Sequence, residues 1–383
     1  MFELLFSHLT HNFLYKILAD ENIYKLKEFF PQNVGLTTYN SSSPFPKLDG
    51  FDALFVRTVS KINQSSITEF PDSLKVIGTG SSGSDHIDKE YFSDKGINII
   101  DAKGCNANAV SEYVITALLL WSIKRNKDLT RLRVGIVGSG KTGSAVQKQC
   151  EMFEIETISY DPPKQERDSN FISGSIKDLL ECDILTFHVP LSKNGDYSTY
   201  HWLDKEILES HRFDLIINAS RGGVIDELSL MEALDKGTVN DVIIDVWENE
   251  PDFNTALVEK SFLSTPHIAG YSEQAKLNAS KMLVQKLTSI FDIDICDSQE
   301  LYAPKVFDIA NLNYSKYEFL LRLNPLREYD ADIRNLCLRP DKAILFQKLR
   351  IDRPYRYEYP FLQIDSNFLE GFNELTKLGI TPK

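Results

Sequence analysis

Three short segments of the chain contain the residue types that hydride transfer from an alcohol carbon requires. Arg221 stands in N-A-S-R-G-G, Glu250 in D-V-W-E-N-E-P and His267 in T-P-H-I-A-G-Y. Oxidation of an alcohol needs a base that takes the hydroxyl proton, and an imidazole titrates near neutral pH. A carboxylate on the second imidazole nitrogen fixes the tautomer and stabilises the protonated ring. We therefore expect His267 to be the acid-base group and Glu250 to orient it.

The arginine adds a preference for a substrate that carries a carboxylate. A planar guanidinium can hold a carboxylate through two hydrogen bonds while it polarises a developing carbonyl group. Arg221 fits this role, so the three residues together indicate a 2-hydroxy acid. Each also has a structural explanation, since Arg221 could lie on the surface, Glu250 in a loop before Pro251 and His267 in a core. Their joint occurrence favours catalysis.

A glycine-rich turn upstream of these segments predicts a dinucleotide site. The sequence V-G-I-V-G-S-G-K-T-G, residues 134–143, places G-x-G-x-x-G after a predicted strand and before a predicted helix over 144–153. Gly138 permits a tight turn, Gly140 lets a pyrophosphate approach the backbone, and Gly143 allows close packing of helix on strand. The helix N-terminus supplies free N–H groups and positive potential.

Asp161, at the end of the next predicted strand, indicates which dinucleotide is bound. Its carboxylate can accept hydrogen bonds from the adenosine ribose and repel a 2′-phosphate, which favours NAD over NADP. Lys164 and Arg167 follow closely and could still accommodate a phosphate. The alternative interpretation of Asp161 is a turn residue before Pro162.

The elements that must position these residues alternate in the way that parallel α/β sheets require. We expect an α/β fold with two Rossmann-like, doubly wound parallel-sheet domains, joined by an apolar helix over 109–121, and a smaller α+β C-terminal domain. After about residue 301 this alternation loosens, which indicates a third unit. The predicted strands are 14–19, 53–56, 75–78 and 98–101 in one domain, and 133–137, 157–160, 184–187, 215–218 and 242–246 in the other.

Through these motifs the chain resembles the D-isomer-specific 2-hydroxyacid dehydrogenases. The resemblance rests on the glycine fingerprint, N-A-x-R-G, D-V-W-x-x-E-P and T-P-H-I-A-G taken together. The segments V-R-T-V-S-K-I-N (56–63), G-C-N-A (104–107), D-P-P (161–163) and L-T-F-H-V-P-L (185–191) extend it to members of vitamin B6 biosynthesis. For such a member the resemblance implies NAD-dependent oxidation of 4-phospho-D-erythronate to 2-oxo-3-hydroxy-4-phosphobutanoate.

The resemblance also implies roles for single residues and domains. Arg221, Glu250 and His267 would be the catalytic set, with His267 as proton donor in the reduction direction. Residues 1–104 with 270–290 would form a substrate or lid domain, 105–269 the NAD-binding domain and 291–383 a domain that mediates homodimerisation. Besides the three glycines, the residues around NAD would be Asp161, Val189, Ala219, Ser220, Arg221, Asp245 and Gly270. Those around the substrate would be Thr58, Ser81 and Tyr271.

Composition narrows the class of protein. With 42 Lys and Arg against 55 Asp and Glu, the net charge of -13 disfavours a nucleic-acid partner. The longest strongly apolar run, 114–121, is too short for a membrane span. Five scattered cysteines without a C-x-x-C pair indicate neither a disulfide framework nor a zinc site, and no other metal site is predicted. A cytoplasmic location fits best.

Several questions stay open at this level. The group that binds a substrate phosphate could be Arg57, Lys61, Arg350, Arg353 or Arg356. The substrate could be another D-2-hydroxy acid, such as 3-phosphoglycerate. A non-enzymatic, NAD-sensing binding protein similar to transcriptional corepressors would share the fold. The first 14 residues, which precede the first predicted strand of the family pattern, have no predicted role.

Overall fold

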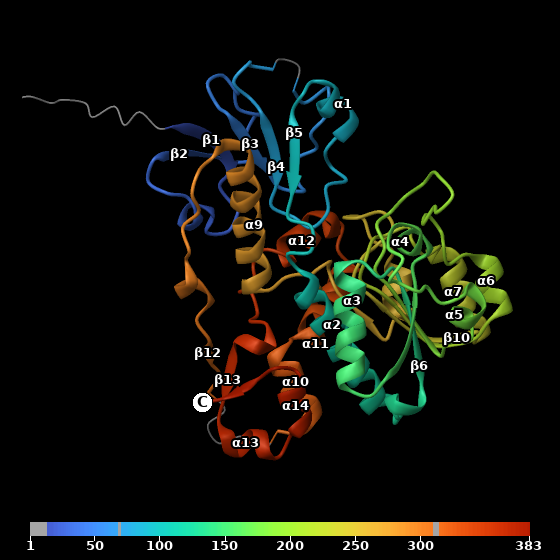
Figure 1. The fold of residues 1–383 in the computed structure, drawn as a ribbon. Helices are drawn as coiled ribbons and strands as arrows, with labels where there is room; N and C mark the ends of the chain where they lie inside the picture. Colours follow the sequence, from blue (N-terminus) through green and yellow to red (C-terminus); the bar gives the residue numbers. More distant parts are fainter. Residues whose placement is uncertain (1–13, 68–69, 309–313) are drawn as a thin grey trace, which may run out of the picture. The chain divides into compact units, whose positions relative to one another are not determined.

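The computed structural model describes residues 14–67, 70–308 and 314–383, and the chain forms two compact units (Figure 1). Unit 1 comprises Met1–Cys105 and Lys276–Tyr302, and unit 2 comprises Asn106–Ala275 and Ala303–Lys383. Of the N-terminal segment without a predicted role, all but Leu14 lies outside the described residues. The division into three domains, with 291–383 as a domain of its own, stays a prediction.

Unit 1 is built on a five-stranded parallel sheet of order β2-β1-β3-β4-β5. Leu277 and Leu283 of helix α9 (Glu273–Phe291) join Phe29 and Phe55 in its core. The sequence pattern predicts four of these strands and misses β2, whose sequence V-G-L-T-T-Y lacks a continuous apolar run. The strands are β1 (Tyr15–Asp20), β2 (Val34–Tyr39), β3 (Ala53–Val56), β4 (Val76–Thr79) and β5 (Asn98–Asp101), with helix α1 at Lys89–Asp94.

Unit 2 contains a six-stranded parallel sheet of order β11-β10-β9-β8-β6-β7. The chain runs from β6 to β7 on one side and then returns to β8 on the other side of β6, which makes a topological switch point at β6. In doubly wound sheets, ligands bind beyond the carboxyl ends of the strands at such a point. The strands are β6 (Arg133–Val137), β7 (Glu156–Tyr160), β8 (Ile184–Phe187), β9 (Phe213–Asn218), β10 (Val239–Ile244) and β11 (Leu263–Ser264).

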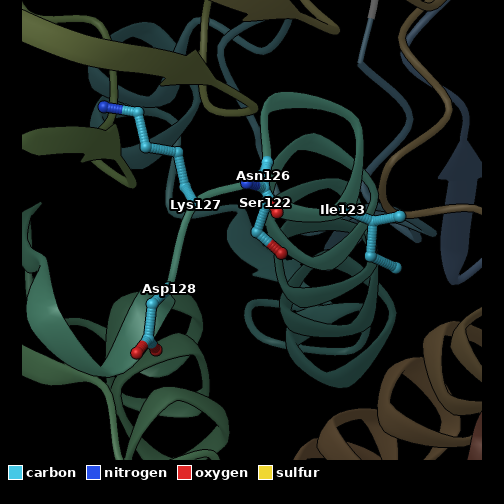
Figure 2. Close-up of a pocket in the computed structure, with 5 residues that line it drawn as sticks. All are labelled: Ser122, Ile123, Asn126, Lys127 and Asp128. Atoms are coloured by element: carbon cyan, nitrogen blue, oxygen red, sulfur yellow. The ribbon is translucent and has the colours of Figure 1, made fainter.

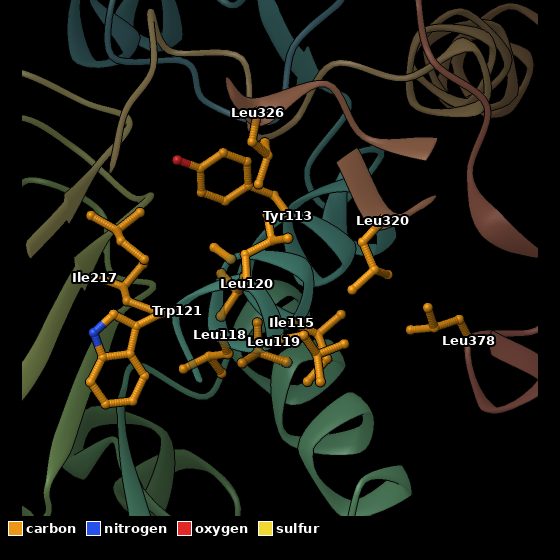
Figure 3. Close-up of a cluster of buried hydrophobic side chains, with 14 of the residues drawn as sticks. Tyr113, Ile115, Leu118, Leu119, Leu120, Trp121, Ile217, Leu320, Leu326 and Leu378 are labelled. Atoms are coloured by element: carbon orange, nitrogen blue, oxygen red, sulfur yellow. The ribbon is translucent and has the colours of Figure 1, made fainter. Parts of the chain in front are cut away.

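Helix α2 (Ala107–Arg125) forms the middle of unit 2 and is longer than the predicted helix over 109–121. Figure 3 shows its apolar side chains between the sheet, represented by Ile217, and C-terminal residues such as Leu320 and Leu378. On the sheet side, Trp121 Nε1 donates a hydrogen bond to Asp241 Oδ2 at 2.9 Å. A helix with apolar residues on all faces is stable only when neighbours cover it on all sides.

The C-terminal region of unit 2 adds helices and a small parallel sheet of order β12-β13-β14. Arg334 of helix α11 (Leu326–Leu336) donates to the carbonyl oxygens of Val258 and Ser261, both at 2.7 Å. Asp330 Oδ1 accepts the backbone N–H of Ser264 at 2.8 Å. These contacts hold α11 against the strand that precedes His267. The α/β fold class with two parallel sheets, predicted from the sequence, is confirmed.

The remaining elements are short. In the sheet-bearing part of unit 2 they are α3 (Lys141–Met152), α4 (Pro162–Arg167), α5 (Ile176–Leu180), α6 (Lys205–Ser210), α7 (Glu227–Lys236) and α8 (Thr255–Lys260). In the C-terminal region they are β12 (Lys305–Val306), α10 (Lys316–Leu323), α12 (Lys342–Leu349), β13 (Leu362–Ile364), α13 (Ser366–Glu370), α14 (Asn373–Lys377) and β14 (Thr381–Pro382). None of the described helices has both the length and the apolar character that crossing a bilayer requires.

Candidate active site

His267 and Glu250 form a direct pair in unit 2. His267 Nδ1 lies 2.7 Å from Glu250 Oε2, and Glu250 Oε1 accepts the backbone N–H of Trp247 at 2.9 Å. Burial raises the pKa of Glu250, but the nearby His267, its hydrogen bond and the Trp247 N–H outweigh burial and hold that pKa below its usual value. Glu250 is therefore an anion that fixes the Nδ1–H tautomer of His267. In that tautomer the lone pair of Nε2 points away from Glu250 and can accept a proton.

The loop that carries His267 is held by Asp245, at the end of β10. Asp245 Oδ1 accepts the Ile268 N–H at 2.8 Å and the Thr265 hydroxyl at 2.6 Å, and Oδ2 accepts the Ala269 N–H at 2.9 Å. The Asp245 carbonyl accepts the His267 N–H at 2.7 Å. His267 itself has a φ of 57°, in the left-handed region that residues other than glycine rarely adopt. These bonds stabilise that strained backbone.

The same contacts explain a difference from the sequence pattern. The apolar run predicts a strand over 242–246, but β10 ends at Ile244. Asp245, the next residue, still donates its backbone N–H to the Asn218 carbonyl at 2.9 Å, while its carboxylate bonds to the backbone of the His267 loop. Asp245 is only 1% exposed, and burial raises the pKa of its carboxyl group against the lowering effect of His267. Its position beside NAD stays a prediction.

Arg221 follows β9 in a tight turn that Asn218 organises. Asn218 Oδ1 accepts the Ser220 N–H at 3.2 Å, and Asn218 Nδ2 donates to the Arg221 carbonyl at 3.1 Å. A Cβ atom at Gly222 would lie 1.8 Å from the carbonyl oxygen of Trp247, so this position admits only glycine. The turn that carries Arg221 therefore lies against the loop that carries Glu250. The structure brings all three predicted catalytic residues to the carboxyl edge of one sheet.

Asn218 and Thr265 stand in the predicted motifs without a predicted role. The Tyr113 hydroxyl lies 2.8 Å from Thr265 Oγ1, which in turn donates to Asp245. Both residues act through the loops that they fix. A polar residue directly after a buried apolar run was the available signal, because such a side chain needs a hydrogen-bond partner in the adjacent loop.

The glycine-rich turn between β6 and α3 has the properties that the sequence predicts. Gly138 has a φ of 92°, and a Cβ there would lie 2.7 Å from the His188 carbonyl oxygen and from Val189 Cγ1. At Gly143 a Cβ would lie 1.8 Å from the Gly138 carbonyl oxygen. At Gly140 a Cβ would meet no atom within 4 Å. The backbone is thus closely packed at Gly138 and Gly143 and open at Gly140, where α3 begins. A pyrophosphate needs such an open approach to the N-terminus of a helix.

Asp161 binds the glycine-rich turn and caps α4. Its Oδ2 accepts the Ser139 N–H at 2.8 Å, and its Oδ1 accepts the Lys164 N–H at 3.0 Å. Asp161 thus has the structural role in a turn that the alternative interpretation gives it. A carboxylate has about four acceptor sites, so Asp161 can still accept hydrogen bonds from ribose hydroxyls. Lys164 Nζ donates to the Ser139 carbonyl at 2.9 Å, and Arg167 Nε to that of Pro163 at 2.9 Å. Both cations already have partners, which weakens the case for a 2′-phosphate site.

The other predicted contact residues lie in both units. Val189, Ala219, Ser220 and Gly270 belong to unit 2, and a Cβ at Gly270 would meet the Asn106 side chain at 2.2 Å. Tyr271 also belongs to unit 2. Thr58 and Ser81 follow the neighbouring strands β3 and β4 of unit 1, where Ser81 Oγ lies 2.9 Å from Thr79 Oγ1. Their contacts with cofactor and substrate stay predictions.

A surface pocket elsewhere in unit 2 contains none of these residues. It is at the C-terminal end of α2 and is lined by Ser122, Ile123, Asn126, Lys127 and Asp128 (Figure 2). Lys127 Nζ donates to Asp214 Oδ2 at 2.7 Å. The pocket is not lined by Arg221, Glu250 or His267, so it is separate from the candidate active site.

Comparison with known proteins agrees with this site. Residues 120–269 match the family described as D-isomer specific 2-hydroxyacid dehydrogenase, NAD binding domain. Erythronate-4-phosphate dehydrogenase of Bacteroides thetaiotaomicron is 36% identical over 348 residues, which cover 90% of this chain and 97% of that protein. The Escherichia coli protein of the same name is 34% identical over 374 residues, covering 95% and 97%.

A solved structure with the same fold is the D-lactate dehydrogenase of Aquifex aeolicus in complex with NAD and lactic acid. It is 24% identical, covers 72% of this chain and 95% of its own, and superimposes with a TM-score of 0.59. The fold, the NAD cofactor and the enzyme class predicted from the sequence are confirmed by these matches. The chain belongs to the D-isomer-specific 2-hydroxyacid dehydrogenases, a family with an NAD-binding domain.

Proposed function

We propose that the chain oxidises the C2 hydroxyl of 4-phospho-D-erythronate with NAD and yields 2-oxo-3-hydroxy-4-phosphobutanoate, a step of vitamin B6 biosynthesis. The observation that carries the proposal is the extent of the similarity. Relatives named erythronate-4-phosphate dehydrogenase match 90% to 96% of the chain, whereas the general family match covers residues 120–269. The similarity therefore includes the C-terminal region, in which the substrate-specific part of such an enzyme can reside.

The chemistry follows from the His267–Glu250 pair. His267 Nε2 takes the proton of the C2 hydroxyl as the C2–H bond breaks and the carbonyl group forms. Glu250 stabilises the imidazolium that results, because the carboxylate accepts the Nδ1–H at 2.7 Å. Arg221 holds the substrate carboxylate and polarises the C2 oxygen. In the reverse direction His267 returns the proton.

NAD accepts the hydride when it is bound. The residues that would hold it fit a dinucleotide: Gly140 leaves the backbone open at the start of α3, and Gly138 and Gly143 permit the tight turn beneath it. Asp161 would receive the adenosine ribose, and Val189, the turn 219–221, Asp245 and Gly270 would border the rest of the cofactor. For the substrate we propose contacts from Thr58, Ser81 and Tyr271.

We also propose that the enzyme is a cytoplasmic homodimer. None of the five cysteines, all of which lie among the described residues, forms a disulfide bond, which suits a reducing compartment. Three apolar side chains of the C-terminal region are exposed, with Leu338 at 90%, Ile344 at 66% and Ile351 at 58%. Exposed apolar residues grouped in one region support an interface between copies. Light scattering on the purified protein would test this, and a monomeric mass at micromolar concentration would contradict it.

A coupled assay tests the proposed substrate. The purified enzyme is incubated with NAD and 4-phospho-D-erythronate, and in parallel with 3-phosphoglycerate and D-lactate, with and without an added 2-oxo acid that re-oxidises NADH formed on the enzyme. We expect selective turnover of the erythronate phosphate. Selective turnover of another acid would be consistent with the family but would show that the substrate is that acid. Absence of turnover with all three acids would favour an NAD-sensing binding protein instead.

A further inference from the structure

The sequence does not distinguish between the three arginines of the C-terminal region, Arg350, Arg353 and Arg356, as candidates for a phosphate site. The structure separates them by their partners. Arg353 is paired with two acids, with Nη1 2.5 Å from Glu328 Oε2 and Nε 3.1 Å from Asp332 Oδ2. Arg356 is buried against Glu112, with Nη1 2.5 Å from Oε2. Both guanidinium groups are neutralised by carboxylates, so neither offers its charge to an anion.

Arg350 differs from both. Its guanidinium stacks over Tyr271, with Cζ 5.4 Å from the ring centroid, and Nη2 donates to the Tyr271 hydroxyl at 2.9 Å. Its Nε is buried and has no hydrogen-bond partner among the described residues. Within residues 14–67, 70–308 and 314–383, Arg350 forms no ion pair. A buried guanidinium N–H without an acceptor is costly, which points to an anionic ligand at this side chain.

Tyr271 connects Arg350 to the catalytic loop. It follows the His267 turn directly, and its backbone N–H donates to the Ile268 carbonyl at 2.8 Å. The next residue, Ser272, pairs with Arg356 in a β-bridge, so the loop after His267 lies along the chain segment that follows Arg350. The positive charge of Arg350 is also among the groups that lower the pKa of Glu250, after burial raises it and His267 lowers it. Arg350 thus faces the catalytic pair from within unit 2.

We infer that Arg350 binds the phosphate group of the substrate and that Tyr271 holds the guanidinium in position for it. The inference rests on the proposed function and specifies how its substrate is chosen. The substrate has a carboxylate at one end and a phosphate at the other. Arg221 serves the carboxylate, so a second planar fork is needed for the phosphate, and Nε with one Nη supplies it. The hydrogen bond from Nη2 to the Tyr271 hydroxyl and the stacking on the Tyr271 ring hold the guanidinium in place.

The test compares Arg350→Gln with Arg353→Gln on two substrates, 4-phospho-D-erythronate and D-erythronate. Loss of a charge-assisted contact should lower kcat/KM of Arg350→Gln for the phosphorylated acid by about 10- to 100-fold, mainly through KM, and reduce its preference over D-erythronate by a similar factor. Arg350→Lys should recover only part of the preference, because it lacks the fork. Arg353→Gln should keep the wild-type preference.

The inference would be overturned if Arg350→Gln lowered kcat/KM equally for both substrates, or if it kept the wild-type preference for 4-phospho-D-erythronate. The thermal midpoint and the NAD affinity of each variant show whether it is folded. If the wild-type enzyme itself does not prefer the phosphorylated acid, the proposed function fails, and titration with inorganic phosphate by calorimetry decides about Arg350 separately. Binding to the wild type that Arg350→Gln abolishes would support the anion site; no binding, or equal binding to both, would overturn it.

Discussion

The two parallel sheets of this chain differ in how the ends of their strands are connected. In unit 2, polar side chains at the strand ends bond to loops that follow other strands: Asp161 to Ser139, and Asp245 to Ile268 and Ala269. In unit 1, most such bonds stay within a single turn, as from Asn22 to Asp20 and from Ser81 to Gly83. Exceptions are the bonds from Gly104 N–H to Ser82 Oγ at 3.1 Å, from Asn40 Nδ2 to Glu21 Oε1 at 2.6 Å and from Lys286 Nζ to Asp101 Oδ1 at 2.8 Å.

This difference is what the proposed roles of the two sheets require. Acid-base chemistry needs groups from several loops to hold fixed distances, since small displacements of the reacting groups cost large factors in rate. In unit 2, cross-loop bonds fix Glu250 and His267. The turn that carries Arg221 has bonds of its own and packs at Gly222 against the Trp247 carbonyl oxygen. Unit 1 presents Thr58 and Ser81 on turns of their own, which suits contacts that contribute to binding rather than to the chemical step.

The largest effect should come from the acid-base group of unit 2. His267→Ala removes the base, so kcat should fall by about 100- to 10,000-fold while NAD binding remains close to wild type. Steady-state kinetics together with calorimetric titration of NAD would measure both quantities. Turnover within a few-fold of wild type would exclude His267 from the mechanism.

Next in size are substitutions in the glycine-rich turn. At Gly143 a Cβ would lie 1.8 Å from the Gly138 carbonyl oxygen, so Gly143→Ala must displace the turn, at a cost of about 1–3 kcal/mol in the free energy of unfolding and with weaker NAD binding. Gly140→Ala is the matched control for stability, because a Cβ there meets no atom within 4 Å. It should retain stability and lose NAD affinity alone. Equal stability of the two variants would contradict the packing argument.

A pH effect on stability should be specific to unit 2 and smaller. Burial lowers the pKa of His188, which follows β8, to about 3. A histidine whose folded pKa lies below its unfolded value of about 6.5 stabilises the fold fully above that pH and progressively less as the pH falls toward the folded pKa. Between pH 7 and pH 5 the unfolding free energy should therefore decrease by about 2 kcal/mol more in the wild type than in His188→Gln.

Tryptophan fluorescence during urea unfolding can measure this, since Trp121, Trp202 and Trp247 all belong to unit 2. Parallel pH dependence of the wild type and His188→Gln would show that His188 is not held neutral. The comparison of variants at each pH removes the contribution of the other titrating groups.

The smallest effect should come from unit 1. Ser81→Ala removes one neutral hydrogen-bonding group, so KM for the acid substrate should rise by about 3- to 10-fold, with kcat and NAD affinity nearly unchanged. A fall in kcat comparable to that of His267→Ala would remove the distinction between the two sheets. An unchanged KM would exclude Ser81 from substrate binding.

The sequence predicts most of unit 2 because its signals are local. Strand β6, the turn at Gly138 and the start of α3 follow one another within a short segment, and each glycine has a separate steric reason. The three predicted catalytic residues stand in the loops that follow β9, β10 and β11, and parallel strands bring their carboxyl ends to one edge. Pattern alone therefore suffices to group them.

Long-range contacts are what the sequence leaves undetermined. The end of β10 depends on bonds from Asp245 to a loop that lies far ahead in the chain, and the full length of α2 depends on C-terminal side chains such as Leu320 that cover it. Arg350, Arg353 and Arg356 look alike in sequence, because only folding shows that two of them face carboxylates. Burial and pairing are tertiary properties that no local pattern encodes.

In the proposed reaction a hydride passes from C2 of the D-2-hydroxy acid to NAD beside His267 of unit 2. The most direct measurement uses 4-phospho-D-erythronate that carries deuterium at C2, with mass spectrometry of the nicotinamide product. We expect wild-type enzyme to form NADH that contains the deuterium, and His267→Ala to form it far more slowly. Product without deuterium, or no reduced nicotinamide from the wild type, would contradict the account.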